Sequence, residues 1–486
     1  MIARTLGQRP PAVPPGLIDK RRRLHGWLAL LAGVSVAAVL GMPGALAAPG
    51  HRAPARAFAT AGLEFPSALP PGLLRPGEKV TLSAQVEHVG SGREAVGAAY
   101  VRGGTSGPFT RLALKFSVNT ASVQVPARFL AGSVFEDYVV IRDPAGGQPA
   151  TLPAGGAAAP YRSWIVRHPV TVALGTHIFG RLARPQAIVA RASVGSGPGQ
   201  VGFDHEPDFN AGPSSFDVAR DGTVWVADTW NKRLLAYAPG KQGAPVRTVK
   251  LPQQPLEVAI APRGTIYVMA GAPLHPWDPR TVYAVGRKGK RLWAHLVTGI
   301  IFNSVMRVDR DGILWIDDPE LGWIPVTSRA GRPLTIAQQI RGTVAYQPLG
   351  GGWQLPDTER YPYEDRIGLA SPGGTLRGCW RLTSRTSFGV DYPQARAGSN
   401  IVEFGDVLNT SAKPHQWEYV IVRFSPAGKV LSKLSVNRLL VYGDFYSFTN
   451  LRVGQDGRLY FLQTSAQWGM RVARYSWPAA AATPQT

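Results

Sequence analysis

One short phrase recurs six times between about residue 213 and residue 478, and it constrains the fold of this chain more than any other feature. The clearest copy runs from Pro213 to Tyr237. It reads as a short strand, an Asp-Gly turn, an alternating strand, a polar loop and a third strand. Gly and Asp recur at the turns because tight hairpins need residues that tolerate positive φ. The phrase therefore predicts a small antiparallel sheet that the chain builds repeatedly.

Two independent landmarks give the same order of copies. One is a turn after the third strand, and the other is the turn before the second strand, which is clear at Asp221-Gly222, Arg263-Gly264, Asp311-Gly312 and Asp456-Gly457 and weaker at 351–355 and 398–404. Repeats of roughly 40–50 residues with this content are typical of a β-propeller with one four-stranded blade per repeat. We predict an all-β chain in which residues 171–478 form a six-bladed β-propeller.

The first copy resembles an NHL repeat over residues 213–251. The resemblance rests on the turn, on the Val-Trp-Val strand that follows it, and on Asp228, Asn231 and Arg233. The other copies lose the Asp-x-x-Asn-x-Arg part. The resemblance implies an NHL-like six-bladed fold. It implies little about activity, because propellers carry many unrelated functions.

The last copy stops early. Residues 471–477 read as a third strand, and only a Pro/Ala tail follows, of which residues 479–486 are expected to be disordered. A blade without a fourth strand would leave a sheet edge exposed. Upstream of the first copy, residues 186–194 read as a strand without a partner of its own. We predict that this strand completes the sixth blade and closes the ring non-covalently.

The N-terminus has the layout of a signal peptide. A basic stretch at 20–23 precedes an apolar run at 27–40, and Ala45-Leu46-Ala47 fits a cleavage site, so residues 1–47 are predicted to be removed. The alternative is an uncleaved anchor, since the run approaches the roughly 20 residues of a spanning helix. We predict a secreted, extracytoplasmic bacterial protein and leave the export route open between the general secretory and twin-arginine systems.

Residues 48–61 read as a Pro/Ala linker, and residues 62–170 change to well-spaced strands. The strands are expected at 79–86, 98–102, 111–116, 122–125 and 135–141. Turn residues separate them, as in an antiparallel β-sandwich. The order resembles Ig-like or fibronectin-like modules of exported bacterial proteins. Residues 158–185 are expected to link this N-terminal sandwich to the ring.

Composition adds two constraints. The only cysteine, Cys379, allows no intramolecular disulfide and is predicted to be a buried core thiol. Lys and Arg outnumber Asp and Glu by 53 to 31, for a formal charge of +22. A basic exported protein can bind an anionic envelope polymer, lipid headgroups or nucleic acid. Nucleic acid is the partner we least expect, and a bias of the whole proteome is an equal explanation of the charge.

The loops between second and third strands crowd one face of a propeller, and here they carry aromatic rings beside carboxylates and amides. Such groups suit sugar rings or peptide segments. The alternative is that the rings pack between blades, and that Asp228, Asn231 and Arg233 form a structural scaffold. The candidate ligand-binding residues are Trp230, Asn231, Trp277, Asp278, Asp317, Asp318, Trp323, Tyr361, Tyr363, His415, Trp417 and Trp468.

The hairpins on the opposite face carry the positive charge instead. These cations are Lys241, Arg287, Lys288, Lys290, Arg291, Arg329, Arg332 and Lys429. The segregation of aromatic rings and cations favours a monomeric binding or scaffolding protein whose propeller face binds a glycan or peptide. No complete catalytic constellation, nucleotide motif or His-x-x-x-His pair is present, so no catalytic residue and no metal ligand is predicted.

The rival hypothesis is a metal-dependent lactonase or lyase on the same face. NHL-like rings occur in peptidylglycine amidating lyase, gluconolactonase-type enzymes and streptogramin lyase, so the resemblance keeps this alternative open. Ca²⁺ could be held by oxygen ligands near 204–208 or 317–320, although turn carboxylates more often cap backbone amides. The test is whether three or more of seven residues converge: Asp204, Asp208, His275, Asp317, Glu364, His415 and Glu418.

Overall fold

A computed structural model gives the fold. It describes residues 63–67, 72–88, 95–117, 120–144, 146, 149–206, 209–240, 243–272, 280–297, 305–318, 322–342, 344, 346–349, 352–355, 363–371, 373–390, 395–397, 400–409, 411–413, 416–437 and 450–477. The predicted signal peptide, linker and C-terminal tail lie outside these residues. Nearly all of the regular secondary structure in the described chain is β-strand, which confirms the all-β prediction.

The N-terminal sheet pair, residues 63–165, consists of two sheets. One has the order β1-β3-β7-β6, and the other has the order β2-β10-β8-β4-β5 with β9 beside β8. Two short 3-10 helices, η1 (Ala127–Leu130) and η2 (Gly156–Ala158), lie in the connections. The strands are β1 (Leu63–Ser67), β2 (Leu73–Leu74), β3 (Thr81–His88), β4 (Val96–Gly103), β5 (Thr110–Ala113), β6 (Lys115–Ser117), β7 (Thr120–Gln124), β8 (Val134–Arg142), β9 (Ala150–Leu152) and β10 (Tyr161–Ile165).

The two sheets enclose one hydrophobic core. Alternate residues of β8 point into it, and Phe135, Val139 and Ile141 are at most 2% exposed. Because side chains alternate across a strand, Glu136, Tyr138 and Val140 face away from this core. The chain crosses from one sheet to the other at Leu114, between β5 and β6. Four of the five strands expected from the sequence fall on single observed strands, whereas the strand expected over 111–116 is divided between β5 and β6, which belong to different sheets.

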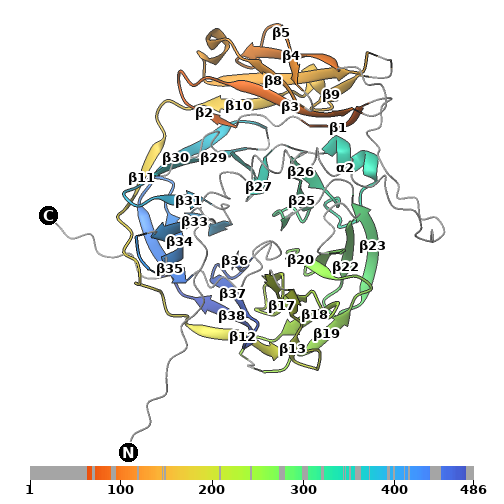
Figure 1. Ribbon diagram of the computed structural model, residues 1–486, viewed down its shortest axis with the longest axis vertical. Coiled ribbons are helices and arrows are strands. Elements are labelled where there is room, and N and C mark those ends of the chain that lie inside the picture. The colour runs from red at the N-terminus through yellow and green to blue at the C-terminus, as the bar shows by residue number, and fades with distance from the viewer. Residues whose placement is uncertain are drawn as a thin grey trace, which may run out of the picture. The chain divides into compact units, whose positions relative to one another are not determined.

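Beyond residue 186 the sheets follow one another around a common centre (Figure 1). We refer to them as the first to sixth ring sheets, in the order of their repeats. The first three are built from consecutive strands: β16 (Ser215–Val218), β17 (Val224–Asp228), β18 (Arg233–Tyr237) and β19 (Arg247–Lys250); β20 (Pro255–Ile260), β21 (Ile266–Ala270), β22 (Arg280–Val285) and β23 (Arg291–Val297); and β24 (Met306–Val308), β25 (Leu314–Asp318) and β26 (Gly322–Pro325).

The last three ring sheets contain the weaker copies and the final copy. The fourth holds β27 (Gln347–Leu349), β28 (Gly352–Leu355), β29 (Glu364–Ala370) and β30 (Leu376–Ser384). The fifth holds β31 (Phe388–Val390), β32 (Ala395–Ala397), β33 (Asn400–Asn409), β34 (Gln416–Phe424) and β35 (Val430–Asn437), and the sixth holds β36 (Leu451–Val453), β37 (Leu459–Ser465) and β38 (Gly469–Tyr475).

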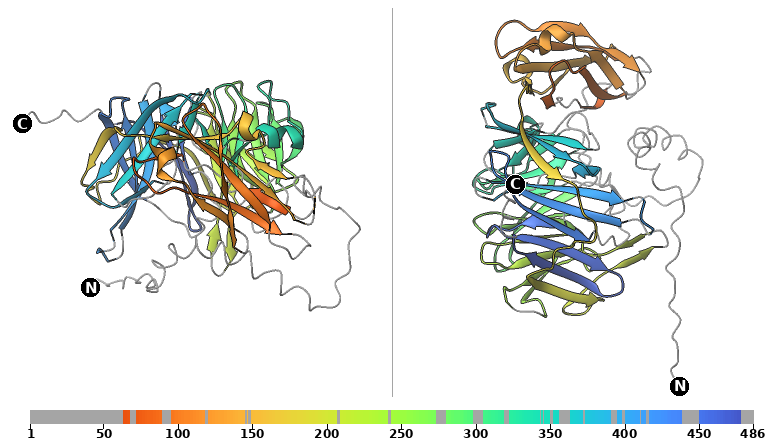
Figure 2. Two further views of the ribbon diagram at one scale, coloured as in Figure 1. Left: turned by 90° about the horizontal axis from the view of Figure 1, so that it is seen from above. Right: turned by 90° about the vertical axis from the view of Figure 1, so that its left-hand side faces the viewer.

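A segment that precedes the ring adds to each of these last three sheets. We call residues 170–194 the belt. Its first strand, β11 (Val170–Gly175), pairs in parallel with β30, and the amide of Ala183 then donates to the carbonyl of Ser435 at 2.7 Å. Its last strand, β12 (Ala187–Val194), pairs antiparallel with β38. Figure 2 shows the belt, in yellow, crossing the outer side of the blue sheets.

The strand expected over 186–194 is therefore β12, with Ala190 opposite Val472. β13 (Gln200–Val201) pairs in parallel with the end of β12. A hydrophobic cluster that includes Phe216 of the first ring sheet and Leu462 of the sixth also contains Ala190. The sixth ring sheet thus packs on the first through residues that β12 helps to cover.

The sequence interpretation differs from the structure at two further places. Residues 158–185 are more than a link, because β10 belongs to the N-terminal sheet pair and β11 to the fourth ring sheet. In the third ring sheet, the helix α2 (Ile336–Gly342) follows where a fourth strand was expected. Thr335 and Gln338 begin this helix with a reciprocal cap, since the Thr335 amide donates to Gln338 Oε1 at 2.9 Å and the Gln338 amide donates to Thr335 Oγ1 at 3.4 Å.

The N-terminal sheet pair contacts the fourth ring sheet directly. Leu73 and Trp164 share a buried cluster with Leu355 and Cys379, and Cys379 is buried as predicted. A Cβ on Gly368 of β29 would lie 2.8 Å from Leu73, so this glycine lets the two parts approach closely. The contact extends the core of the ring into the N-terminal sheet pair.

Candidate functional site

The structure describes only part of the predicted ligand face. Four candidates lie outside the described residues, namely Trp277, Asp278, Tyr361 and His415, and so do Asp208 and His275. Asp318 is described only by its backbone, at the end of β25. The remaining candidates divide into buried side chains and exposed ones.

Asn231 belongs to a structural scaffold in the first ring sheet. Its Nδ2 donates to the Gly195 carbonyl at 3.0 Å and to Asp228 Oδ2 at 2.9 Å. Arg233 donates to Asp228 at 2.7 Å and to the carbonyls of Gly197 and Gln200. Burial raises the pKa of Asp228, and its bonds to Asn231, to the Gly202 amide and to Arg233 oppose that rise. The Asp-x-x-Asn-x-Arg part therefore fixes the loop that follows β12.

Two of the candidate tryptophans pack into the protein. Trp323 is 6% exposed and lies in a cluster with Val305 and Trp315. Trp230 is half-buried, and its indole N–H has no hydrogen-bond acceptor among the residues that the structure describes. For Trp323, the interpretation as structural packing holds.

Two other aromatic rings stay exposed. Trp468 lies in the turn between β37 and β38 and is 39% exposed, with the Arg471 guanidinium 5.1 Å from its ring centre. Tyr363 precedes β29 and is 55% exposed. Trp417, at the start of β34, is half-buried. Trp468 and Tyr363 are thus available to a ligand at two turns of the same type.

The described carboxylates that were tested for convergence on one metal or catalytic site bond to separate partners. Glu418 accepts hydrogen bonds from the Gly180 amide at 2.7 Å and contacts His177 Nε2 at 2.9 Å, while Glu364 pairs with Arg75 at 3.2 Å. Asp204 lies in β14 (Asp204–Glu206), which pairs with β15 (Phe209–Ala211). Within the described part of the chain, no group of three or more His, Cys, Asp or Glu could hold a metal ion.

A cluster that the sequence analysis missed lies on the first strands of four ring sheets and on β25. Arg452 of β36 donates to Glu257 of β20 at 2.7 Å, to the Val258 carbonyl at 3.0 Å and to the Phe216 carbonyl at 3.1 Å. The Ile260 amide donates to Asp217 of β16 at 2.7 Å. These bonds join the sixth, first and second ring sheets. Strands β20, β25 and β36 lie toward the centre in Figure 1.

Burial dominates the electrostatics of this cluster. It raises the pKa of Asp217 and brings the pKa of Asp317 to about 6, although Arg307 opposes the rise at Asp317. Burial also lowers the pKa of Arg307 to about 9, with the like charge of Arg452 as the next cause. A signal for this cluster existed in the sequence, because Asp217, Arg307 and Arg452 occupy the same place before their turn glycines.

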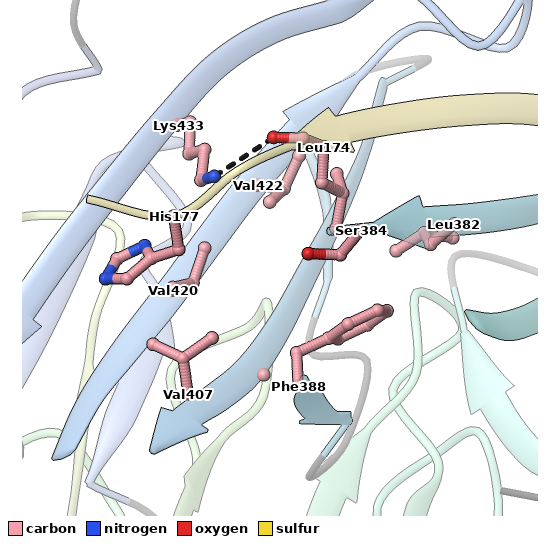
Figure 3. Close-up of a pocket in the computed structure, with 10 residues that line it drawn as sticks. Leu174, His177, Leu382, Ser384, Phe388, Val407, Val420, Val422 and Lys433 are labelled. Atoms are coloured by element: carbon pink, nitrogen blue, oxygen red, sulfur yellow. Dashed lines mark hydrogen bonds between the residues drawn. The ribbon is translucent and has the colours of Figure 1, made fainter. Parts of the chain in front are cut away.

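A small cavity lies under the belt (Figure 3). Leu174, His177, Phe388 and Lys433 are among its lining residues, and its volume of about 20 Å³ is enough for one water molecule. Lys433 Nζ donates to the Leu174 carbonyl at 3.1 Å. Burial lowers the pKa values of both Lys433 and His177. The cavity is too small for a ligand larger than water. The contacts of its lining residues, such as the bond from Lys433 to Leu174, instead hold the belt in place.

No helix among the described residues is long and apolar enough to cross a membrane.

Comparison with known proteins gives little. No family model and no curated protein matches the chain. Among solved structures, a streptogramin B lyase is 12% identical, with a TM-score of 0.29 over 54% of this chain and 78% of its own. Virginiamycin B lyase from Staphylococcus aureus is 9% identical (TM-score 0.28; 71% and 91%), and YCF48 bound to D1 peptide is 11% identical (TM-score 0.29; 59% and 100%). Likenesses at this level carry no argument about function.

Proposed function

We propose that the chain is an exported binding or scaffolding protein, in which an Ig-like sandwich precedes a six-bladed propeller of NHL type. The order of the ring sheets, the pairing of β12 with β38 and the shared core of the sixth and first ring sheets support the propeller. The common core of the N-terminal sheet pair supports the sandwich. The propeller face that carries the turns between second and third strands binds a glycan or peptide.

One observation carries this proposal: Trp468 and Tyr363 keep large aromatic surfaces in water, at turns that share one face by topology. Large aromatic side chains are usually substantially buried. An exposed ring offers apolar area with few rotatable bonds, so it loses little entropy when it contacts a ligand. The Arg471 guanidinium against Trp468 also restricts that ring.

Binding to glycan and peptide arrays tests the proposal. We expect a specific ligand for the wild-type chain and at least tenfold weaker binding for Trp468→Ala. Leu292→Ala is the matched control, because Leu292 is 55% exposed on a hairpin of the opposite face. Absence of any ligand at millimolar concentration, together with hydrolysis of a lactone or ester, would instead favour the metal-dependent enzyme.

We also propose that the opposite face binds an anionic envelope polymer. The hairpins of the second and third ring sheets carry six exposed cations, namely Arg287, Lys288, Lys290, Arg291, Arg329 and Arg332. Of these, Arg329 has a nearby carboxylate, Asp311 at 3.2 Å, and no ion pair is seen for the others among the described residues. A cluster of this kind attracts polyanions through a force that salt screens.

Binding of the chain to a soluble polyphosphate at several salt concentrations tests this second proposal. We expect affinity to fall steeply with salt, and to fall at least tenfold when Arg287 and Lys290 are both changed to Glu. Changing Lys79 and Arg128, two exposed cations of the N-terminal sheet pair, to Glu should have a smaller effect. Equal losses from both pairs would mean that net charge alone causes binding.

A further inference from the structure

A groove lies over β4 and β8 of the N-terminal sheet pair and extends to Leu114 and Phe116, where the chain crosses between the two sheets, and all of its lining residues belong to this sheet pair. Its volume is about 340 Å³, within the range of small-ligand sites. Its floor lies over β4 and β8, where Ala98 is opposite Val140 on one side and Ala113 on the other. The small side chain of Ala98 leaves a hollow between larger neighbours such as Tyr100 and Val140.

The walls of the groove are fixed by packing. The Tyr100 ring stacks on Tyr138 with centroids 4.7 Å apart, and Phe109 meets Tyr138 edge-on at 5.0 Å. A Cβ on Gly97 would lie 2.5 Å from the Val140 carbonyl, so only glycine permits this approach of the two strands. A hollow with such walls is present before any ligand arrives, which reduces the entropy lost on binding.

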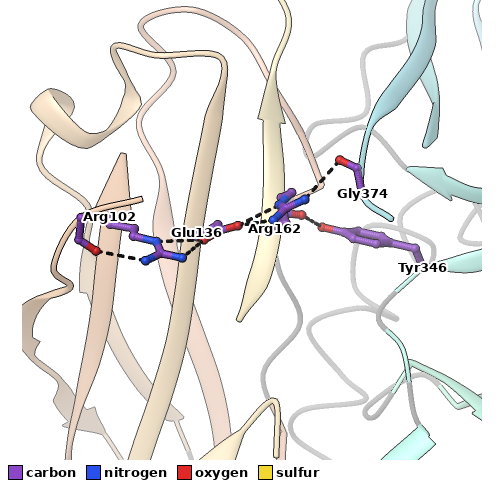
Figure 4. Close-up of polar contacts among 6 residues, drawn as sticks. Arg102, Glu136, Arg162, Tyr346 and Gly374 are labelled. Atoms are coloured by element: carbon purple, nitrogen blue, oxygen red, sulfur yellow. Dashed lines mark hydrogen bonds and ion pairs between the residues drawn. The ribbon is translucent and has the colours of Figure 1, made fainter. Parts of the chain in front are cut away.

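Two exposed arginines, Arg111 and Arg142, flank the groove. Two other arginines on the same face differ from them because they have a carboxylate partner. Arg102 and Arg162 both bond to the buried carboxylate of Glu136, at 2.5 Å and 2.6 Å, and Arg162 also reaches the Gly374 carbonyl of the ring (Figure 4). Within the described residues, Arg111 and Arg142 form no ion pair. The two arginines at the ring end of this face thus share one carboxylate, which offsets part of their charge, whereas the two at the groove have no such partner in the described part of the chain.

We propose that this groove binds an extended acidic peptide segment of a partner protein. Planar guanidinium groups pair with carboxylates in a two-bonded geometry, while the floor of Ala98 and Val140 accepts an apolar side chain between them. Arg142 lies at the level of Val96, and Arg111 lies at the level of Tyr100. At about 3.3 Å per residue the two levels are about 13 Å apart, which is the span of an extended pentapeptide.

Other occupants fit less well. Residues 48–61 of this chain contain Arg52 and Arg56 and no Asp or Glu, so like charge opposes their binding. A second copy of a chain with a formal charge of +22 is disfavoured for the same reason. One face of the Tyr100 ring is covered by Tyr138 and cannot stack on a sugar. A segment with alternating acidic and apolar residues complements both the charge and the floor.

Fluorescence anisotropy of a labelled pentapeptide, with glutamate at both ends, leucine at the centre and alanine elsewhere, tests the proposal on the full chain. We expect saturable binding that becomes at least tenfold weaker when Arg111 and Arg142 are both changed to Gln. Ala98→Leu, which fills the floor from the outward face, should weaken binding at least fivefold. Changing Lys79 and Arg128 to Gln is the matched control and should change affinity less than twofold.

Three outcomes would overturn the proposal. The first is equal affinity for the wild-type chain and the Arg111/Arg142 double variant, when circular dichroism shows both to be folded. The second is equal binding of the same peptide with lysine at both ends. The third is tighter binding of an acidic oligosaccharide than of the peptide, which would assign the groove to glycans. Trp468→Ala should leave peptide binding unchanged, so this test is independent of the ligand face of the ring.

Discussion

The two halves of the ring are built in different ways. In the first and second ring sheets every strand comes from one stretch of chain, and neighbouring strands in the sheet are neighbours in sequence. The fourth, fifth and sixth ring sheets also need the belt, which precedes the first repeat. Local hairpins form the first half, whereas the second half depends on contacts between residues about 200 or more positions apart.

This difference suggests why the polar phrase of the NHL repeat is complete only in the first copy. Asp228, Asn231 and Arg233 bond to the loop 195–202, which connects β12 to the first ring sheet. No other repeat follows directly on the belt. The bonds of Asp228, Asn231 and Arg233 therefore hold the loop at the point where the two halves meet, and we call this set of bonds the lock.

The largest expected effect comes from removing the belt. Deletion of residues 1–200 removes the hydrogen bonds between β12 and β38 and the buried side chains of Ala190 and Ala192. We expect a loss of on the order of 5 kcal/mol, which approaches the whole stability of a typical domain. Deletion through residue 168 keeps the belt and should retain a cooperative ring. Equal melting temperatures of the two truncations would show that the ring does not depend on the belt.

The next effect concerns the centre of the ring, where Arg452 of the second half meets Glu257 of the first. Both side chains are at most 5% exposed. Glu257→Gln removes the carboxylate that pairs directly with the buried Arg452 guanidinium, so we expect a loss of about 3–5 kcal/mol in urea unfolding. Asp311→Asn removes the exposed pair with Arg329 and should cost less than about 1 kcal/mol. Similar losses for the two variants would contradict a central role for the buried pair.

A smaller effect is expected at the lock between belt and first repeat. Asp228→Asn weakens the charge-assisted bond to Arg233 and should lower the free energy of unfolding by about 2 kcal/mol. Asp221→Asn, at an exposed turn of the same sheet, is the control and should change it by less than about 0.5 kcal/mol. If proteolysis within 195–202 does not increase in Asp228→Asn, the phrase does not hold that loop.

The smallest effect is a pH dependence of the belt. Burial lowers the pKa of His177 below 6.5, and this cause outweighs the opposing effect of Glu418. Below about pH 6.5 the unfolded chain therefore binds a proton that the folded chain does not, so stability should fall as pH decreases. Thermal melts between pH 7.5 and pH 5 should show a weaker fall for His177→Gln. An unchanged pH profile in this variant would exclude His177 as the cause.

The sequence was informative where contacts are local. Turn glycines such as Gly222 and Gly312 have positive φ, and the strands that flank them appear where the alternation predicts them. The pairing of β11 with β30 left no such signal, because its strands are far apart in sequence and belong to no common repeat. The cap at Thr335 was overlooked because the repeat predicted a strand there.

The candidate site was harder to predict than the fold. Alternation cannot distinguish a buried aromatic side chain, such as Trp323, from one that stays exposed to water, such as Trp468, because both follow a second strand. The charged cluster of Asp217, Glu257 and Arg452 depends on three sheets meeting at one centre. A repeat pattern gives the place of each residue within its own sheet, but not its partners in the others.

Hydrogen exchange of the full chain, followed by mass spectrometry, tests the central claim most directly. The claim is that β12 pairs with β38 and joins the two halves of the ring. We expect the amides of residues 187–194 to exchange as slowly as those of 470–475 and of the first ring sheet, because ladder bonds open only with the sheet that contains them. Exchange of 187–194 within seconds, while 470–475 stay protected, would contradict the claim.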